Sequence, residues 1–395
     1  MKGRRAFLYV QHLLGIGHLK RAATLANALA AEGLDVTLAS GGFEVPGIKL
    51  AGVRFVQLPP AGAADSSFKV LVDSDGKPVD EDWRKKRRGI LLDAWRTADP
   101  HVLVIELYPF GRRQMRFELI PLLEAAAAAA RRPLIVCSVR DVIGAGQKDV
   151  ARQDEMLELF GLHFDRLLVH GDPAVIPFSR TFRHTDKIES RLHYTGYVVD
   201  DTRSGSPQAC GGATPGEGEV IVSAGGGAVG MRLLETAIRA RPYSVLANRT
   251  WRVLGGVNAV TADLATLASV ADVTGEGRVV VERARSDFPI LLANCALSVS
   301  QGGYNTMMEI LQACTRAVVV PFAARAETEQ TLRAQSFADR GLIDIVEEDA
   351  LTPESLAAAV DRAAARPRPT PDAIDLNGAR RTAALVAGWT AEFAW

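Results

Sequence analysis

The sequence predicts an α/β protein made of two doubly wound parallel sheets. Short apolar runs alternate with segments of helical periodicity through most of the chain. Continuous apolar strands separated by helices are typical of parallel sheets that are covered on both faces. The alternation stops in the Gly-, Ser-, Pro- and Thr-rich stretch 200–218 and then restarts, which indicates a linker. A length of 395 residues is enough for two such domains.

The N-terminal half, residues 1–199, is expected to form the first domain. Its strands are predicted at the apolar runs AFLYVQ (6–11), DVTLAS (35–40), VRFVQLP (53–59), HVLVIEL (101–107), PLIVCSV (133–139) and RLLVHG (166–171). Its helices are predicted at 18–33, where a glycine ends the helical spacing, and around 81–98, 113–131 and 148–161.

The C-terminal half, residues 219–377, repeats this pattern and is expected to form the second domain. A helix is expected from about residue 230, and Thr352 before Pro353 is typical of an N-cap and a first helical turn. Residues 378–395 are expected to form a helix that packs back on the N-terminal domain. The predicted strands are EVIVSA (219–224), TWRVLGG (250–256), RVVVER (278–283), ALSVSQ (296–301), RAVVVPF (316–322) and LIDIVEE (342–348).

Composition argues against several classes of function. Lysine and arginine number 46, as do aspartate and glutamate, so the charge balance gives no reason to expect a nucleic-acid partner. The four cysteines show no CxxC or Cys/His cluster, which argues against a zinc site or a disulfide framework and favours a cytoplasmic location. The start of the chain is interpreted as a strand rather than a secretion signal, and no apolar run reaches the ~18 residues of a spanning helix. Peripheral contact with a membrane stays open.

The stretch HLLGIGHLKRA (12–22) is the first candidate site. Ligands of open parallel sheets bind beyond the carboxyl ends of the strands, and this loop is expected to follow the first strand. Gly15 and Gly17 would let a ligand approach the backbone, and His18 titrates near neutral pH and can transfer a proton. The alternative is that His18, or the nearby His12, only stabilises the loop.

Two glycine loops in the C-terminal half are candidates for a diphosphate site. SAGGGAVGMR (223–232) has the G-x-G-x-x-G pattern, but the next strand lacks the carboxylate that a nicotinamide ribose needs, and no Walker sequence is present. SQGGYNTMMEI (300–310) repeats the order of strand, two glycines and helix. Helix N-termini attract anions, and Glu309, one turn on, would accept hydrogen bonds from ribose hydroxyls. The alternatives are plain tight turns and a solvated glutamate.

Three further polar stretches have two interpretations each. In VVVPFAARAETEQTLRA (318–334), Glu329 and Gln330 would bind sugar hydroxyls or act as partners of a helix dipole. DSDG (73–76) has the D-x-D spacing of a manganese site but is interpreted as a turn. RKKRR (84–88) is interpreted as a solvated helix face, the alternative being a site for an acidic lipid or a phosphorylated acceptor.

A set of motifs along the chain is typical of one family. It comprises GxGHxxR from Gly15 to Arg21, ELYPFGRR (106–113), SVRDV (138–142), GYV (196–198), GGYNT (302–306), VVVPF and EQTLRA. In these motifs the chain resembles the GT-B glycosyltransferases of the MurG-like kind, with a family 28 C-terminal type of second domain, and most of all a group of predicted bacterial glycosyltransferases that begin with GxGHxxR. The resemblance implies two Rossmann-like domains with the active site in the cleft between them, and inverting transfer from a nucleotide-diphosphate sugar, a UDP-sugar above all.

Carried over residue by residue, the resemblance implies a donor site in the C-terminal half. Glu309 would bind ribose, and Arg283 with Ala284 would frame the base. Glu329 and Gln330 match a Gln-Gln pair that holds the donor sugar, the first of which is replaced here. The residues that would face the diphosphate are Gly226, Gly227, Gly302, Gly303, Asn305 and Thr306.

On the acceptor side, His18 is the candidate base for the incoming hydroxyl, and Gly15, Gly17 and His12 would line the site. Glu106 and Asp141 follow strands of the first half, so either would be an acceptor contact, a helper of His18 or the base itself. Arg112 and Arg113 would bind an anionic acceptor or a neighbouring carboxylate.

Helix N-termini can stabilise a leaving diphosphate, so no metal and no cofactor besides the nucleotide sugar are expected. The acceptor is left open among lipid-linked, polysaccharide and small-molecule hydroxyls. An epimerase of nucleotide sugars on the same fold, a non-catalytic protein that binds nucleotide sugars and, more weakly, a nicotinamide oxidoreductase are the alternatives.

Overall fold

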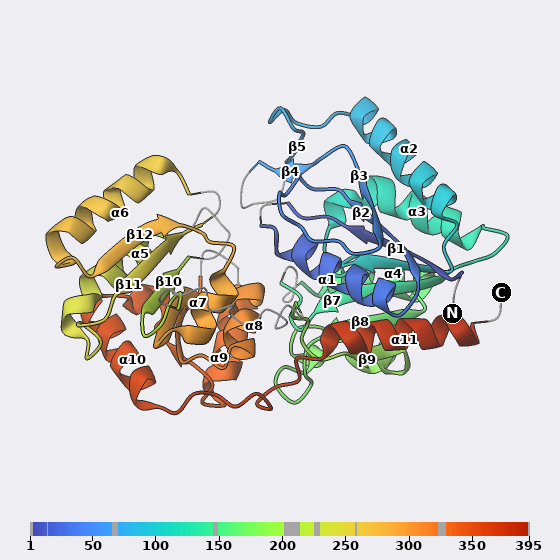
Figure 1. Cartoon of the computed structure of the whole chain (residues 1–395). Helices are drawn as coiled ribbons and strands as arrows, with labels where there is room; N and C mark the ends of the chain where they lie inside the picture. Colours follow the sequence, from blue (N-terminus) through green and yellow to red (C-terminus); the bar gives the residue numbers. More distant parts are fainter. Residues whose placement is uncertain are drawn as a thin grey trace. The chain divides into compact units, whose positions relative to one another are not determined.

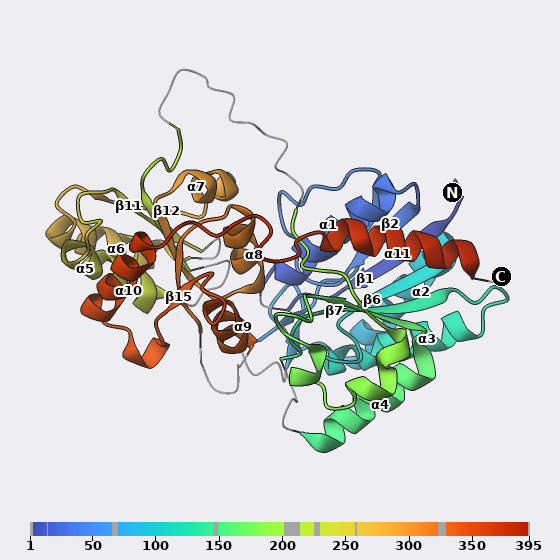
Figure 2. The same cartoon turned by 90° about the horizontal axis from the view of Figure 1, so that it is seen from below.

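The computed structural model describes residues 3–13, 15–64, 70–144, 149–200, 214–224, 230–256, 259–322 and 329–393. The chain divides into two compact units. Unit 1 consists of residues 1–200 and 375–395, and unit 2 of residues 201–374. Each unit has a sheet with helices packed on it (Figures 1 and 2). Most of the predicted linker, residues 201–213, lies outside the described residues.

The sheet of unit 1 has seven strands in the order β3-β2-β1-β6-β7-β8-β9, and all its pairings are parallel. Its strands are β1 (Arg5–Val10), β2 (Asp35–Ser40), β3 (Val53–Gln57), β6 (Val102–Glu106), β7 (Leu134–Arg140), β8 (Arg166–His170) and β9 (Leu192–Tyr194). A short antiparallel hairpin, β4 (Gly62–Ala63) and β5 (Leu71–Val72), follows β3 in the chain. The predicted strands of this half are confirmed, while β9 and the hairpin were not predicted.

Helices cover both faces of this sheet because the side chains of its strands alternate between two cores. On β1, Phe7 and Tyr9 pack in one core, and Leu8 and Val10 in the other. The first core receives α2 (Glu81–Ala98), α3 (Arg116–Ala127) and α4 (Val150–His163), and the second receives α1 (Gly17–Ala31) and α11 (Gly378–Glu392). Short 3-10 turns complete the unit at η1 (Arg113–Met115), η2 (Phe178–Arg180) and η3 (Thr185–Arg191).

The C-terminal helix belongs to unit 1. α11 lies beside α1 in both views, and its apolar residues join the core under α1 (Figures 1 and 2). A single bridge between Val198 and Asn377 brings the two ends of this unit's chain segments together just before α11 begins.

The sheet of unit 2 has six parallel strands in the order β12-β11-β10-β13-β14-β15. Thr352 caps the helix that begins at Pro353, as predicted, since Thr352 Oγ1 accepts a hydrogen bond from the backbone N of Ser355 at 3.1 Å. The strands are β10 (Val220–Ser223), β11 (Trp251–Gly255), β12 (Val279–Arg283), β13 (Leu297–Gln301), β14 (Ala317–Val320) and β15 (Asp344–Ile345). The helices are α5 (Met231–Ala240), α6 (Thr261–Thr274), α7 (Phe288–Asn294), α8 (Tyr304–Gln312), α9 (Glu329–Ala338) and α10 (Pro353–Ala365), with 3-10 turns η5 (Arg241–Tyr243) and η6 (Glu348–Ala350).

Each sheet reverses its strand order once, between β1 and β6 in unit 1 and between β10 and β13 in unit 2. The predicted fold class, two doubly wound parallel sheets, is therefore confirmed. Among the residues that the structure describes, none of the helices is long and apolar enough to cross a bilayer.

Candidate active site

The first candidate site lies where the strand order reverses in unit 1. β1 and β6 are neighbours there. β6 ends at Glu106, and the loop after β1 leads to α1, which begins at Gly17. His18 is therefore in the first turn of a helix whose N-cap, Ile16, makes no side-chain cap hydrogen bond. Ligands of open parallel sheets bind at such a reversal, beyond the carboxyl ends of the strands.

Both ring nitrogens of His18 have partners. Nδ1 lies 2.8 Å from Oε1 of Glu106, and Nε2 contacts Nη2 of Arg140, the last residue of β7. A guanidinium only donates hydrogen bonds, and an ionised carboxylate only accepts them. Nε2 therefore accepts from Arg140, while Nδ1 carries the proton and donates it to Glu106. The imidazole is neutral in this arrangement.

Burial and neighbouring charges account for these protonation states. Burial lowers the pKa of His18 to about 3, Arg140 and Arg112 act in the same direction, and Glu106 opposes them. Burial would raise the pKa of Glu106, but His18, Arg21 and Arg112 outweigh it and hold that pKa well below its usual range. Arg21, which follows His18 by three residues on α1, also contacts Oε1 of Glu106. The site thus combines an ionised carboxylate with a neutral imidazole.

Arg112 ties the loop after β6 to the loop after β1. Its backbone has a left-handed φ of 58°, and its Nε donates a hydrogen bond to the carbonyl oxygen of Gln11 at 2.7 Å. Burial lowers the pKa of this guanidinium, against the attraction of Glu106. The acceptor-binding role of Arg112 stays a prediction.

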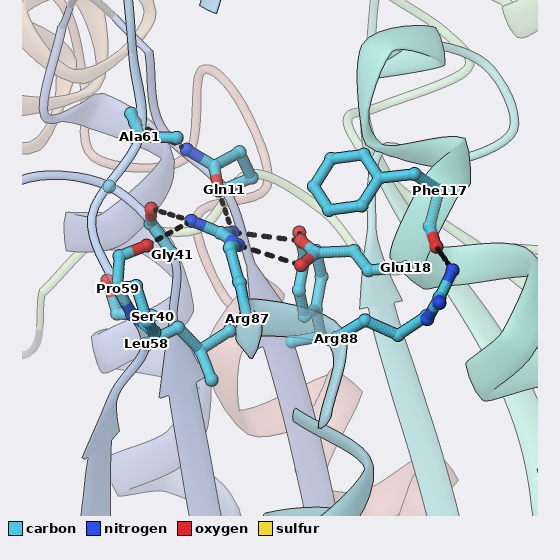
Figure 3. A network of polar contacts seen from close by, with 12 residues as sticks. Gln11, Ser40, Gly41, Leu58, Pro59, Ala61, Arg87, Arg88, Phe117 and Glu118 are labelled. Atoms are coloured by element: carbon cyan, nitrogen blue, oxygen red, sulfur yellow. Dashed lines mark hydrogen bonds and ion pairs between the residues drawn. The ribbon is translucent and has the colours of Figure 1, made fainter. Parts of the chain in front are cut away.

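A buried polar network holds Gln11, the first residue after β1 (Figure 3). Nη2 of Arg87 donates to Oε1 of Gln11 at 2.6 Å, and the same guanidinium pairs with Glu118 at 2.7 and 2.8 Å. Nη1 of Arg87 donates to the carbonyl oxygens of Gly41 and Pro59. The side chains of Arg87 and Glu118 are both fully buried.

This network corrects the interpretation of RKKRR (84–88) as a solvated helix face. Lys85 and Lys86 are exposed, as that interpretation requires. The interpretation is wrong for Arg87, whose side chain is buried between α2 and α3.

The stretch DSDG forms a turn, as predicted. Oδ1 of Asp73 accepts hydrogen bonds from the backbone N of Asp75 and from that of Lys77.

The remaining acceptor-side residues His12, Asp141 and Arg113 contact other groups. The ring of His12 packs against Gly42, and burial lowers its pKa. Asp141 is buried, and its Oδ1 accepts a hydrogen bond from the backbone N of Val142 at 2.9 Å. Arg113 is exposed, with Nε 3.9 Å from Oε2 of Glu155.

The second candidate site lies at the reversal in unit 2, beyond the ends of β10 and β13. Gly226 and Gly227 of the first glycine loop lie outside the described residues. Gly230, which ends that loop, has a φ of 130°, and a Cβ there would lie 2.5 Å from the Cβ of Ala224. The fold itself therefore requires glycine at position 230.

The second glycine loop has no such requirement at Gly303. Gly303 is the N-cap of α8, makes no side-chain cap, and has an ordinary φ of −62°. A Cβ there would meet none of the described atoms within 4 Å. Asn305 and Thr306 lie partly exposed in the first turn of α8, and Glu309 lies half-buried farther along the helix.

The start of α9 lies against this second loop. A Cβ on Gly302 would be 3.4 Å from the Cβ of Gln330, and Oε1 of Gln330 accepts a hydrogen bond from the backbone N of Phe322 at 3.2 Å. Glu329 pairs with the fully buried Arg333 at 2.9 Å. Two segments singled out separately in the sequence are thus neighbours in space.

Arg283 lies at the end of β12, next to Ala284. Nη1 donates to the carbonyl oxygen of Ala259 and Nη2 to Oγ1 of Thr261, both at 2.9 Å. These bonds hold the start of α6. The role of Arg283 beside the nucleobase stays a prediction. Ala284 is exposed, and its predicted place beside the nucleobase stays a prediction.

Two residues of the first site, Arg21 and Arg140, were not assigned a role from the sequence. Arg21 ends the stretch GxGHxxR, and Arg140 lies in SVRDV. Residues three apart on a helix share a face. That spacing would have placed Arg21 beside His18. Arg140 is 122 residues from His18, and only the strand order brings the two together.

Comparison with known proteins agrees with this architecture. Residues 284–384 match the glycosyltransferase family 28 C-terminal domain. UDP-N-acetylglucosamine--N-acetylmuramyl-(pentapeptide) pyrophosphoryl-undecaprenol N-acetylglucosamine transferase of Paramagnetospirillum magneticum is 25% identical over 198 residues, and that of Geobacillus kaustophilus is 27% identical over 172 residues. These alignments cover 50% and 43% of this chain and 53% and 46% of the relatives. The chain therefore spans about half the length of the curated relatives it matches.

Solved structures match over nearly the whole chain. A calicheamicin glycosyltransferase superposes with a TM-score of 0.58 at 18% identity and covers 99% of this chain and 97% of its own. MurG of Acinetobacter baumannii superposes with a TM-score of 0.57 at 15% identity and covers 97% of this chain and 99% of its own. At these identities the likeness concerns the fold. The chain has the GT-B fold of the MurG-like glycosyltransferases, and its residues 284–384 match the C-terminal domain of glycosyltransferase family 28.

Proposed function

We propose that this chain is an inverting, metal-independent glycosyltransferase that moves a sugar from a nucleotide-diphosphate sugar to an acceptor hydroxyl. The observation that carries the proposal is the pair of His18 and Glu106 at the strand reversal of unit 1, with Nδ1 and Oε1 2.8 Å apart. The names of the curated relatives support a donor of the UDP-N-acetylglucosamine kind and a lipid-linked acceptor. A cytoplasmic location, at the inner face of a membrane when the acceptor is lipid-linked, belongs to the same proposal.

The donor would bind to unit 2. The N-cap of α8 leaves helix N–H groups without a side-chain cap, and such groups with the helix dipole attract a diphosphate. Glu309 would accept hydrogen bonds from ribose, and Gln330 and Glu329 would hold the sugar. The open space above Gly303 supports this assignment, because nothing in the described fold demands a glycine there.

His18 would act on the acceptor. As the acceptor oxygen forms its bond to the anomeric carbon, Nε2 takes the hydroxyl proton, and the bond from the anomeric carbon to the diphosphate oxygen breaks. The diphosphate leaves with the electron pair of that bond and is stabilised by the helix N–H groups. Glu106 keeps the proton on Nδ1 and stabilises the imidazolium that forms. A single direct displacement inverts the anomeric centre.

The proposal is tested by incubating the protein with UDP-N-acetylglucosamine, with and without a polyprenyl-diphosphate-linked sugar, and measuring the release of UDP. We expect release that depends on the acceptor, and a product of inverted configuration by NMR. A change of the nucleotide sugar in the absence of acceptor would instead identify an epimerase. A thermal-shift panel of UDP, dTDP, GDP and ADP would identify the base, and no stabilisation by any of them would contradict the donor site.

We predict that Gly303→Ala weakens UDP binding by about tenfold or more, because the added methyl group occupies the space in which the diphosphate would meet the helix start. The free energy of unfolding should change by less than about 1 kcal/mol, since alanine tolerates the observed φ. Isothermal titration and urea unfolding measure the two effects. Gly388→Ala is the matched control, because its Cβ would also meet nothing within 4 Å, but in α11. Equal UDP affinity in both variants would contradict the assignment.

The pH profile follows from the state of His18. The base must be neutral, and a pKa of about 3 means that it stays neutral well below the ordinary range of histidine. We therefore predict that kcat/KM changes less than about twofold between about pH 5 and pH 7. Steady-state rates in overlapping buffers measure this, and an acidic limb near pH 6.5 would show that His18 is not held as the structure shows.

A further inference from the structure

The nitrogen of His18 that the proposed reaction needs is already engaged. Nδ1 donates to Glu106, so only the lone pair of Nε2 is able to take a proton from a hydroxyl. That lone pair accepts a hydrogen bond from Nη2 of Arg140. An acceptor hydroxyl and Arg140 therefore compete for one atom.

The strand geometry explains why Arg140 reaches this atom. The last residue of β6, Glu106, is paired with Ser138 of β7. β7 continues for two more residues, so Arg140 extends past the end of β6. Ser138 and Arg140 point to the same face because side chains alternate along a strand. Arg140 is thus placed by the sheet, not by a surface loop.

We propose that Arg140 is a positioning residue that covers the proton-accepting nitrogen of His18 until the acceptor hydroxyl takes its place. This inference rests on the proposed function. It assigns Arg140 two linked effects: its guanidinium occupies Nε2 in the unliganded protein, and its charge keeps the imidazole neutral. The base is then withheld from water and other hydroxyls while no acceptor is bound.

The other charged groups that face His18 have different anchors. Glu106, from β6, holds Nδ1, and Arg21, from α1, contacts Oε1 of Glu106. Arg112, from the loop after β6, donates Nε to the carbonyl oxygen of Gln11. Of these groups, Arg140 alone is seen at Nε2 in the part of the chain that the structure describes.

The first test needs no turnover. The seven histidines are labelled with ¹⁵N, His18 is assigned by the signal lost in His18→Gln, and its titration is followed by NMR. We expect an unprotonated Nε2 in the wild type, and a rise in the pKa of His18 by about one unit or more in Arg140→Met, because a nearby positive charge is removed. Arg140→Lys keeps the charge and should stay closer to the wild type.

Arg96→Met is the matched control, because Arg96 lies on α2 with a largely exposed side chain and an ion pair to Asp93. It should leave the titration of His18 unchanged. The same titration in Arg140→Met and in the wild type would overturn the inference. If Arg140→Met does not fold, Arg140→Gln makes the same test.

The second test uses catalysis. In Arg140→Met the acidic limb of kcat/KM should move to higher pH by the shift that NMR measures, while KM for the acceptor at high pH should fall, since no guanidinium has to be displaced. A raised KM would instead make Arg140 an acceptor contact and would overturn the inference. If no variant and no wild-type protein transfers sugar, the proposed function fails, whereas active enzymes with an unshifted His18 contradict only the role of Arg140.

Discussion

Replacing His18 by glutamine is expected to lower kcat by roughly 10²- to 10⁴-fold, because a positioned general base contributes that much to a proton transfer. Glutamine retains polar groups near Glu106 and Arg140 but has no titratable nitrogen. KM for the nucleotide sugar should change little, because the donor-binding residues that we propose all lie in unit 2. Initial rates of UDP release with saturating donor measure the effect.

The matched variant for this experiment is Glu106→Gln. An amide has nearly the shape of the carboxylate but does not carry the charge that stabilises an imidazolium, so kcat should fall here as well. Asp141→Asn tests the other candidate carboxylate, whose Oδ1 accepts a hydrogen bond from the backbone N of Val142. A His18→Gln enzyme that keeps more than about a tenth of its activity would exclude His18 as the base.

Replacing Arg87 by methionine is expected to lower the free energy of unfolding by about 3–5 kcal/mol, the largest effect on stability that we predict. The side chains of Arg87 and Glu118 are each 0% exposed, and the substitution leaves the charge of Glu118 buried without its cation. It also removes the hydrogen bonds that Arg87 donates to Oε1 of Gln11 and to the carbonyl oxygens of Gly41 and Pro59. Urea unfolding at 25 °C, followed by circular dichroism, measures the loss.

Two further variants distinguish the buried pair from general damage to α2. Lys86→Met changes the exposed neighbour on the same helix and should alter the free energy of unfolding by less than about 0.5 kcal/mol. Arg87→Met combined with Glu118→Met removes both charges, and this double variant should be more stable than Arg87→Met alone. If it is less stable, the buried charge of Glu118 is not the source of the loss.

The buried network also bears on the site. Arg87 holds the side chain of Gln11 (Figure 3). Arg112 holds the carbonyl oxygen of the same residue, which begins the loop that leads to His18. The lowered stability of Arg87→Met should therefore be accompanied by a less well-placed base.

Much of the fold can be predicted from the order of residues along the chain, because the signals are local. The run DVTLAS reads as a buried strand and is β2, and the range 81–98 reads as a helix and is α2. Thr352 and Pro353 announce the start of α10 in the same way. In each case the hydrogen bonds and apolar contacts that form the element lie within a few residues or follow from its periodicity.

The composition of the site depends on partners that are far apart in sequence. His18 and Glu106 are 88 residues apart, and both were singled out because each follows a strand, yet their contact follows only from the strand order. Arg140 acquires its contact with Nε2 only because β7 extends two residues beyond β6. Arg87 shares its sequence context with solvated lysines, and only the packing of α2 against α3 decides that it is buried. Local patterns specify helices, strands and turns, whereas long-range packing decides which charges meet and which nitrogen of His18 is covered, since those contacts exist only once the sheet has formed.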